Sequence, residues 1–182
     1  MTPPPEALAA PVSDRAGPDD PDNLICPAIE IFDAEDVDAR IDERLGDATD
    51  DKALRAAAVS VLREAQAAGR AAIAEAFTLR PHDARPTVRA YAWLTDGIVR
   101  TVFRLAVTRL HPRPNPTQSE RLAVMAVGGY GRAEMAPFSD VDLLFLTPYK
   151  ITGWAESVIE SMLYMLWDLH LKVGHSSRTV KD

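Results

Sequence analysis

Two aspartates beside a glycine-rich turn are the residues of this chain whose types and spacing can do chemistry. Gly128, Gly129 and Gly131 follow an apolar run and are expected to turn the chain into a short helix. Asp140 and Asp142 begin a second apolar run. Residues two apart point to the same side of a strand, so both carboxylates are expected to share one face. Such a pair can hold Mg²⁺ against the phosphates of a substrate.

Neighbouring groups extend this candidate site. Backbone N–H groups of the turn at 128–131 can bind an anion such as a triphosphate. Arg132 can bind phosphate oxygens, or it can form an ion pair with Glu134 or Asp140. Ser139 can hydrogen-bond phosphate, or it can close a turn. Together the residues predict metal-dependent nucleotidyl transfer, although each motif alone also fits an ordinary turn followed by solvated aspartates.

The elements that must position these residues are predicted from periodicity and capping. Val141 is expected in the core beneath the two carboxylates, with Leu143 on the opposite side from Val141, and Tyr130 is expected to pack. Strands are expected at 122–127, 140–146 and 171–179, and helices at 34–45, 50–79, 85–110 and 153–171. The two long helices are expected to form an antiparallel pair beside the sheet. The predicted fold class is α/β (α+β), with a small mixed sheet preceded by the antiparallel helical segment.

Three regions follow from composition. Residues 1–30 are rich in Pro and Asp and are expected to be a disordered tail. Residues 31–116 are expected to be the helical segment, ending in a proline-rich linker. Residues 117–182 are expected to be the catalytic core, incomplete at its C-terminus.

Charge and composition restrict the function classes. A formal net charge of −7 argues against a nucleic-acid substrate, since binding to DNA or RNA depends on clustered Lys and Arg. The single cysteine, Cys26, fits a reducing compartment. No apolar run approaches the roughly 18 residues that a membrane span requires, and no signal peptide is evident. A cytoplasmic protein with no membrane association is expected.

The string AVGGYGRAEMAPFSDVDLLFL, residues 126–146, resembles the DNA polymerase β nucleotidyltransferase superfamily. Within it, the string is most similar to the family of bifunctional uridylyltransferase/uridylyl-removing enzymes. The resemblance is good over about residues 85–182 and looser from about residue 50. Ala133 stands where that family usually has glycine. Enzymes of the family are several-fold longer, with a phosphohydrolase (HD) domain and two ACT domains after the transferase, so we expect this chain to be an N-terminal part.

The resemblance implies Mg²⁺-dependent transfer of UMP from UTP to a tyrosine of the PII nitrogen-signalling protein, with release of pyrophosphate. It implies metal binding by Asp140 and Asp142. Nucleotide binding is implied for Gly128, Gly129, Gly131, Arg132 and Ser139. The superfamily also uses a third carboxylate on a later strand. The acids after Asp142 are Glu156, Glu160, Asp168 and Asp182, and none of them is a good candidate.

Two alternatives stay open on the sequence. A truncated nucleotidyltransferase fold can serve as a non-catalytic nucleotide-binding or interaction module. An adenylyltransferase acting on glutamine synthetase shares the S-D-x-D-L core. No residue here selects uracil over adenine by a stated rule, so the base remains open.

Overall fold

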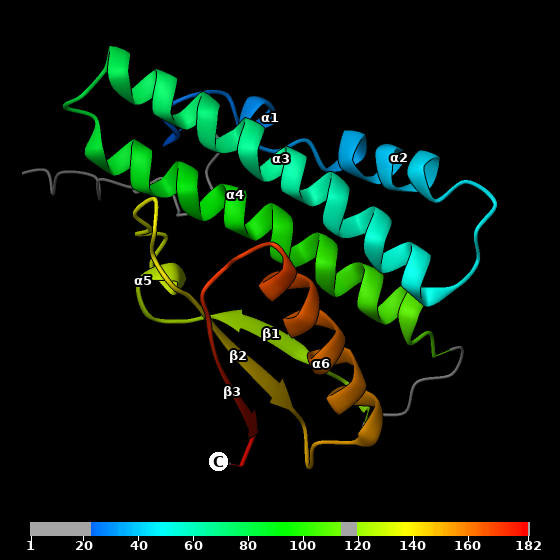
Figure 1. Ribbon diagram of the computed structural model, residues 1–182. Helices are drawn as coiled ribbons and strands as arrows, with labels where there is room; N and C mark the ends of the chain where they lie inside the picture. Colours follow the sequence, from blue (N-terminus) through cyan, green and yellow to red (C-terminus); the bar gives the residue numbers. More distant parts are fainter. Residues whose placement is uncertain (1–22, 114–119, 182) are drawn as a thin grey trace, which may run out of the picture.

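The computed structural model describes residues 23–113 and 120–181. A layer of long helices lies over a further helix and a three-stranded sheet (Figure 1). The mixed helix-and-strand fold predicted from the sequence is confirmed. In chain order the elements are α1 (Ala28–Ile31), α2 (Ala34–Leu45), α3 (Asp51–Leu79), α4 (Ala84–Leu105), the π-helical turn η2 (Ala106–Leu110), β1 (Ala123–Ala126), α5 (Gly128–Gly131), β2 (Val141–Thr147), α6 (Gly153–Asp168) and β3 (Val173–Thr179).

Local signals fix where the first long helices start. The Asp33 carboxylate accepts hydrogen bonds from two backbone N–H groups in the first turn of α2, and α2 ends before Gly46, whose φ is +54°. At the start of α3, the Asp50 carboxylate accepts a hydrogen bond from the Ala53 N–H at 2.9 Å. Both caps satisfy N–H groups that have no partner inside the helix. The starts and ends predicted for these two helices are therefore confirmed.

The fourth helix ends differently from its prediction. Regular α-helix stops at Leu105, and the chain continues to Leu110 as a π-helical turn closed by a hydrogen bond from His111 N–H to the Ala106 carbonyl at 2.9 Å. The His111 carbonyl then accepts a hydrogen bond from the Trp154 indole at 2.9 Å. This contact with α6 is non-local, so the periodicity of residues 85–110 could not predict the wider turn.

The packed region begins earlier than the boundary expected at residue 30. Helix α1 starts at Ala28, and the side chains of Ile25 and Ile31 are buried against the long helices. Residues 24–32 are mostly apolar, and this run, after the Pro- and Asp-rich residues that precede it, was the sequence signal for the earlier boundary. Residues 1–22, and the boundary expected between 116 and 117, lie outside the described residues.

The sheet has the order β1-β2-β3, with β1 and β2 antiparallel and β2 and β3 parallel. The parallel pair requires a crossover, which α6 supplies. Helix α6 stops three residues before its predicted end, and His170 adopts a φ of +58° in the turn that leads into β3. The expected mixed sheet is thus confirmed, and its two parallel strands, β2 and β3, begin at the same end of the sheet.

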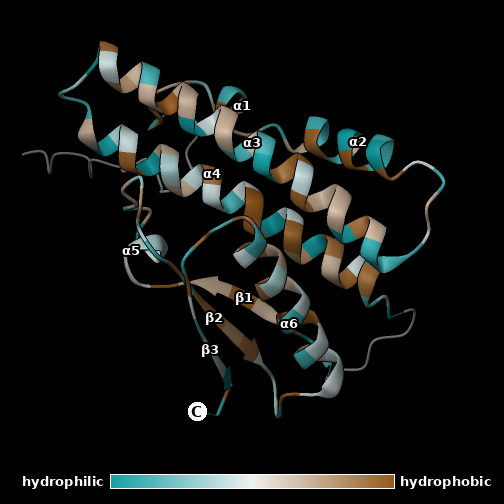
Figure 2. Cartoon of the chain, in the orientation of Figure 1, coloured by the Kyte–Doolittle hydropathy of each residue, from teal (hydrophilic) through white to brown (hydrophobic). Residues whose placement is uncertain are grey.

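Helix α6 carries the largest share of the contact between the layers. It packs on β3 below and on α3, α4 and η2 above (Figures 1 and 2). In this position the side chains of Val158, Met162 and Leu166 are fully buried. Helices α3 and α4 run antiparallel above it, as expected (Figure 1). Within the described ranges, no helix is long and apolar enough to cross a membrane.

Candidate active site

The turn between β1 and β2 depends on glycine at two positions, for different reasons. Gly128 has a φ of +62°, a conformation that costs a side-chain-bearing residue about 1–2 kcal/mol. A Cβ on Gly131 would lie only 2.6 Å from the Ala126 carbonyl oxygen. The turn closes as the single-turn helix α5, with the Gly131 N–H donating to the Val127 carbonyl at 2.9 Å. The short helix predicted after the first strand is confirmed.

The carboxylate of Asp142 occupies the space that two glycines leave open. A Cβ on Gly128 would lie 2.9 Å from Asp142 Oδ2, and a Cβ on Gly174 would lie 2.4 Å from Oδ1. Gly174 is the residue paired with Asp142 across β2 and β3. The Val127 N–H also donates to the Asp142 carbonyl at 3.0 Å, which ties the glycine turn to β2. The tertiary structure therefore brings the turn, the second aspartate and β3 to one place.

Gly174 was not among the residues that the sequence assigned to the site. The only signal was a glycine inside an otherwise strand-like run, which often marks the close approach of another group. Its partner on β2 could not be deduced from the sequence, because the register of two parallel strands joined by a helix is set by tertiary packing.

Asp140 stands immediately before β2 and is exposed, whereas Asp142 is half-buried. Neither carboxylate makes a hydrogen bond or an ion pair with any residue in the described ranges. Val141 is buried, as expected, with 1% of its surface exposed. The expectation for Leu143 was wrong: it is also buried, because residues two apart on a strand share a face. The same rule places Asp142 on the opposite face from Val141.

Arg132 and Ser139 are both engaged within the protein. Arg132 Nε lies 3.0 Å from a Glu134 carboxylate oxygen, and its NH1 donates to the Gly128 carbonyl at 2.9 Å. The Ser139 hydroxyl accepts a hydrogen bond from the Ala136 N–H at 2.8 Å and so closes a turn. These contacts match the structural alternatives considered for both residues, and their binding to phosphate stays a prediction.

Tyr130 anchors the glycine turn to the helical layer. Its side chain is buried, and its hydroxyl donates to Asp96 Oδ1 on α4 at 2.7 Å. Burial, with the adjacent Asp96 charge, raises the pKa of the Tyr130 phenol above its usual range. The packing interpretation of Tyr130 is confirmed, and the neutral phenol serves as a hydrogen-bond donor.

The candidate donors for a metal ion are two carboxylates. Over residues 23–113 and 120–181, no group of three or more His, Cys, Asp or Glu side chains is placed to hold a metal. Two carboxylates without cationic partners, Asp140 and Asp142, fit Mg²⁺, which is commonly bound by one or two carboxylates together with substrate phosphates. The glycines that make room for Asp142 keep the carboxylate beside the turn.

Comparisons with known proteins identify the family of the chain. The family model described as glutamate-ammonia ligase adenylyltransferase matches residues 22–171. Curated relatives named bifunctional uridylyltransferase/uridylyl-removing enzyme match over most of the chain. The relative from Ruegeria pomeroyi is 67% identical over 152 residues, 84% of this chain and 17% of its own length. The relative from Cereibacter sphaeroides is 59% identical over 177 residues, 95% of this chain and 19% of its own. No solved structure matches the chain.

The mixed sheet, the glycine turn and these matches define a nucleotidyltransferase-type domain. The chain belongs to the family of bifunctional uridylyltransferase/uridylyl-removing enzymes. It spans less than a fifth of the length of the curated relatives compared above.

Proposed function

We propose that the protein carrying this chain transfers UMP from UTP to a tyrosine hydroxyl of the PII signalling protein, in the cytoplasm, and releases pyrophosphate. The observation that carries the proposal is the Asp142 carboxylate, which lies between Gly128 and Gly174 without a cationic partner among the described residues. A fixed carboxylate with free lone pairs beside a glycine turn suits a metal-bound triphosphate. The names of the relatives support uridylyl transfer.

In this proposal Asp140 and Asp142 hold Mg²⁺. When bound, the ion would neutralise charge on the triphosphate and on the departing pyrophosphate. The N–H groups of Gly128 and Gly129 bind phosphate oxygens. The Gly131 N–H is already donated to the Val127 carbonyl, so Gly131 contributes to the nucleotide site by closing the turn without a side chain. The net charge of −7 favours a protein acceptor over a nucleic acid.

Arg132 and Ser139 complete the proposed nucleotide site. The guanidinium of Arg132 is largely exposed and already lies over the turn through its contact with the Gly128 carbonyl. Exchanging its pairing with Glu134 for a phosphate would replace one exposed ion pair with a charge-assisted contact. Ser139 sets the turn that leads into Asp140, so its contribution is to position that aspartate beside the phosphates.

The test uses a full-length protein that carries this segment, with UTP labelled at the α-phosphate, a PII protein and Mg²⁺. We expect label to reach a PII tyrosine, to require Mg²⁺, and to be lost in Asp140→Asn. The matched control is Asp47→Asn, since Asp47 is an exposed carboxylate in the helical region. Transfer that persists after chelation, or that is undiminished in Asp140→Asn, contradicts the proposal.

A second candidate is adenylyl transfer to glutamine synthetase, which is favoured by the match of residues 22–171 to the glutamate-ammonia ligase adenylyltransferase family model. Competition between UTP and ATP separates the two reactions. In an assay with labelled UTP, excess unlabelled UTP lowers the transfer of label by a uridylyltransferase, whereas excess ATP does not. With labelled ATP and glutamine synthetase, an adenylyltransferase shows the reverse pattern. A non-catalytic module is distinguished by the same assay: it binds UTP with Mg²⁺ weakly and transfers nothing to either acceptor.

A further inference from the structure

A cavity lies behind the candidate active site, and Ser139 is part of its lining. Its volume is about 250 Å³, and its walls come from α3, α4, the loop at 135–139 and the turn at 170–172. The buried side chain of Val141 lines it. Asp142, the next residue, lies instead against Gly128 and Gly174. Because adjacent residues of a strand point to opposite faces, the cavity and the Asp142 carboxylate lie on opposite sides of β2.

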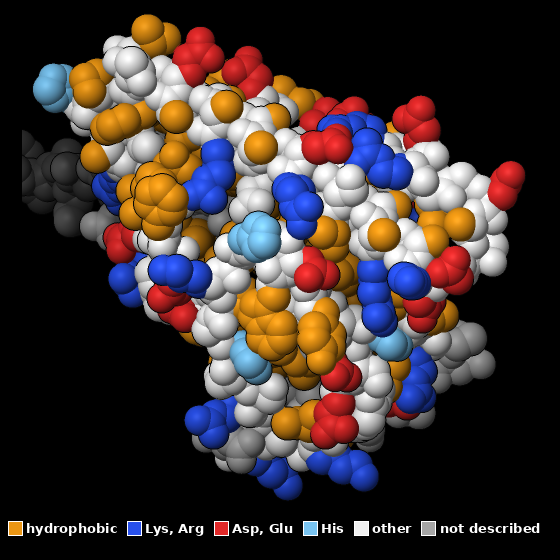
Figure 3. Space-filling model, in the orientation of Figure 1, with side chains coloured by type: hydrophobic (Ala, Val, Ile, Leu, Met, Phe, Trp, Pro, Cys, Tyr) orange, Lys and Arg blue, Asp and Glu red, His pale blue; other side chains and the backbone are white. Residues whose placement is uncertain are grey.

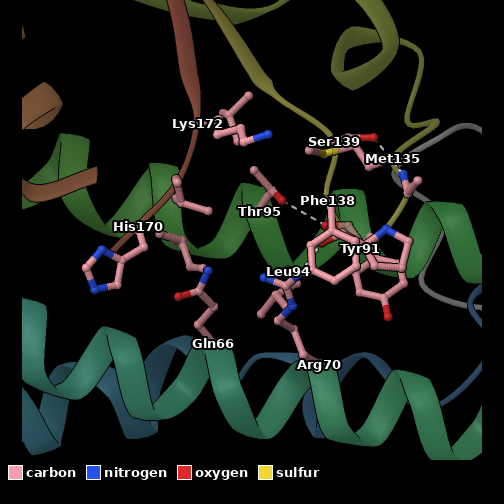
Figure 4. A pocket seen from close by; sticks show the side chains of 15 residues that line it. Gln66, Arg70, Tyr91, Leu94, Thr95, Met135, Phe138, Ser139, His170 and Lys172 are labelled. Carbon is pink, nitrogen blue, oxygen red and sulfur yellow. Dashed lines mark hydrogen bonds between the residues drawn. The ribbon is translucent and has the colours of Figure 1, made fainter. Parts of the chain in front are cut away.

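The charged side chains that line this cavity are basic, although the chain as a whole is acidic. Arg70 and Lys172 line the cavity together with His170, and no Asp or Glu is among its lining residues. None of the three forms an ion pair with a described residue. Figure 4 shows Arg70 and Gln66 reaching in from α3, with Lys172 on the opposite side. In a protein with a formal net charge of −7, a concave surface with unpaired cations favours an anionic ligand.

The remaining lining is apolar and aromatic. Leu94 and Ile98 are buried on α4 and form part of the wall. The Phe138 ring is 85% exposed, and the Arg70 guanidinium carbon lies 5.4 Å from its centroid. Arg70 also donates a hydrogen bond to the Pro137 carbonyl, which holds the loop beside the cavity. An exposed ring fixed at the edge of a cavity provides a surface on which a flat ligand can stack.

We propose that this cavity binds a small organic anion with a flat apolar body, of the class of an aromatic carboxylate. The anionic group lies between Lys172 and Arg70, and the apolar body contacts Phe138, Leu94 and Ile98. Ligand pockets commonly combine an apolar lining with a few convergent polar groups in this way, and a volume of about 250 Å³ admits only a compact molecule. The inference is independent of the nucleotidyl transfer proposed above.

The first test titrates the chain with benzoate, benzamide and inorganic phosphate while the methyl signals of Leu94 and Ile98 are followed by NMR. Benzoate is expected to shift these signals saturably. Benzamide has a similar shape without the charge, and phosphate has charge without the apolar body, so both are expected to bind at least about fivefold more weakly, the scale of one exposed charge pair. No response to benzoate, or equal binding of benzamide, overturns the proposal.

Two variants locate the binding site. Lys172→Met is expected to weaken benzoate binding about fivefold and to leave benzamide unchanged. Lys150→Met is the matched control, because Lys150 is exposed in the loop after β2. Gln66→Glu places a negative charge in the wall without changing its shape, and a glutamate four residues before Arg70 is compatible with the helix. It is expected to weaken benzoate binding at least tenfold. Wild-type affinity in both Lys172→Met and Gln66→Glu overturns the proposal.

Discussion

The charged side chains of the helical layer are paired within the protein, whereas those at the start of the central strand β2 are not. In the helical layer, Glu64 on α3 pairs with both Arg40 and Arg44 on α2, with Arg44 at 2.8 Å. Acidic and basic side chains lie next to one another over this part of the surface (Figure 3). At the start of β2, Asp140 and Asp142 have no cationic partner within the described ranges. Charges that join helices are neutralised within the fold, whereas these carboxylates have no such partner and are therefore the ones proposed to bind an external cation.

The two regions also use glycine differently. On α3, a Cβ on Gly69 would lie 2.2 Å from the Ile31 carbonyl oxygen, so this glycine lets the end of α1 approach the helix. On β3, Gly174 makes room for a carboxylate. Substitution at Gly69 is therefore expected to cost stability, and substitution at Gly174 is expected to cost function.

The largest effect is expected for Asp142→Asn in a full-length protein that carries this chain. The substitution keeps the shape and removes the negative charge, so nucleotidyl transfer is expected to fall roughly 100-fold or more, the scale for removing one electrostatic contact at a reacting centre. The melting temperature is expected to change little, because the carboxylate has no protein partner to lose. Asp47→Asn, tested in parallel, is expected to retain full transfer. Full activity in Asp142→Asn would show that the unpaired carboxylate at β2 has no more functional importance than the paired charges of the helical layer.

Gly174→Ala is expected to lower transfer about 10- to 100-fold. The new Cβ would lie 2.4 Å from Asp142 Oδ1, which must then move, and a displacement of about 1 Å at a reactive group can cost 100-fold. Steady-state transfer rates measure the loss of activity, and thermal melts measure any loss of stability. Gly153→Ala is the control, since a Cβ there meets no atom within 4 Å. A loss of stability without loss of activity per folded molecule would show that Gly174 serves packing alone.

Gly69→Ala is expected to lower the free energy of unfolding by about 1–3 kcal/mol, the usual cost of overpacking. A gain in helix propensity of up to about 1 kcal/mol offsets part of this cost. The neighbour is a backbone oxygen of Ile31, so relief requires a shift of α1. Urea denaturation, followed by circular dichroism, measures the free energy of unfolding of the variant and of the wild type. A stabilised variant would mean that α1 does not pack against α3 as described.

The smallest effect is expected for Glu64→Gln. The hydrogen bond from Arg44 lowers the pKa of Glu64 below its usual value. A lowered pKa in the folded state contributes stability that is present above the pKa of the unfolded chain and is lost as the pH falls through the folded-state pKa. The wild type is therefore expected to be slightly more stable than Glu64→Gln at about pH 7, and the difference is expected to be smaller at about pH 3. An equal difference at both pH values would show that the ion pairs of Glu64 are not its source.

The parts of the fold that were predicted from sequence depend on local interactions. Asp33 caps the helix that follows it, and the glycines at 128–131 form the turn itself. Asp50, which was expected as the first residue of its helix, is the cap of that helix and acts equally locally. Such features depend on residues a few positions apart, so pattern and spacing suffice to find them. The error at Leu143 was one of reasoning, because its burial follows from the same alternation that placed Asp142.

Other features could not be predicted because they depend on residues far apart in the chain. The burial of Ile25, the π-helical turn after Leu105 and the hydrogen bond from Tyr130 to Asp96 all require the helical layer to be assembled. The cavity beside Arg70 and Lys172 is likewise formed by five separate segments, namely α3, α4, the loop at 135–139, the start of β2 and the turn at 170–172. No periodicity within one element predicts such contacts.

By itself the sequence determined the helices and the glycine turn, and it singled out Asp140 and Asp142 as the residues proposed to hold a metal ion. Only the tertiary structure decided that Asp142 lies between Gly128 and Gly174 and that no described cation neutralises it. The physical reason is that capping and alternation act within one element. Strand register and the pairing of charges are set instead by the packing of elements that are distant in the chain.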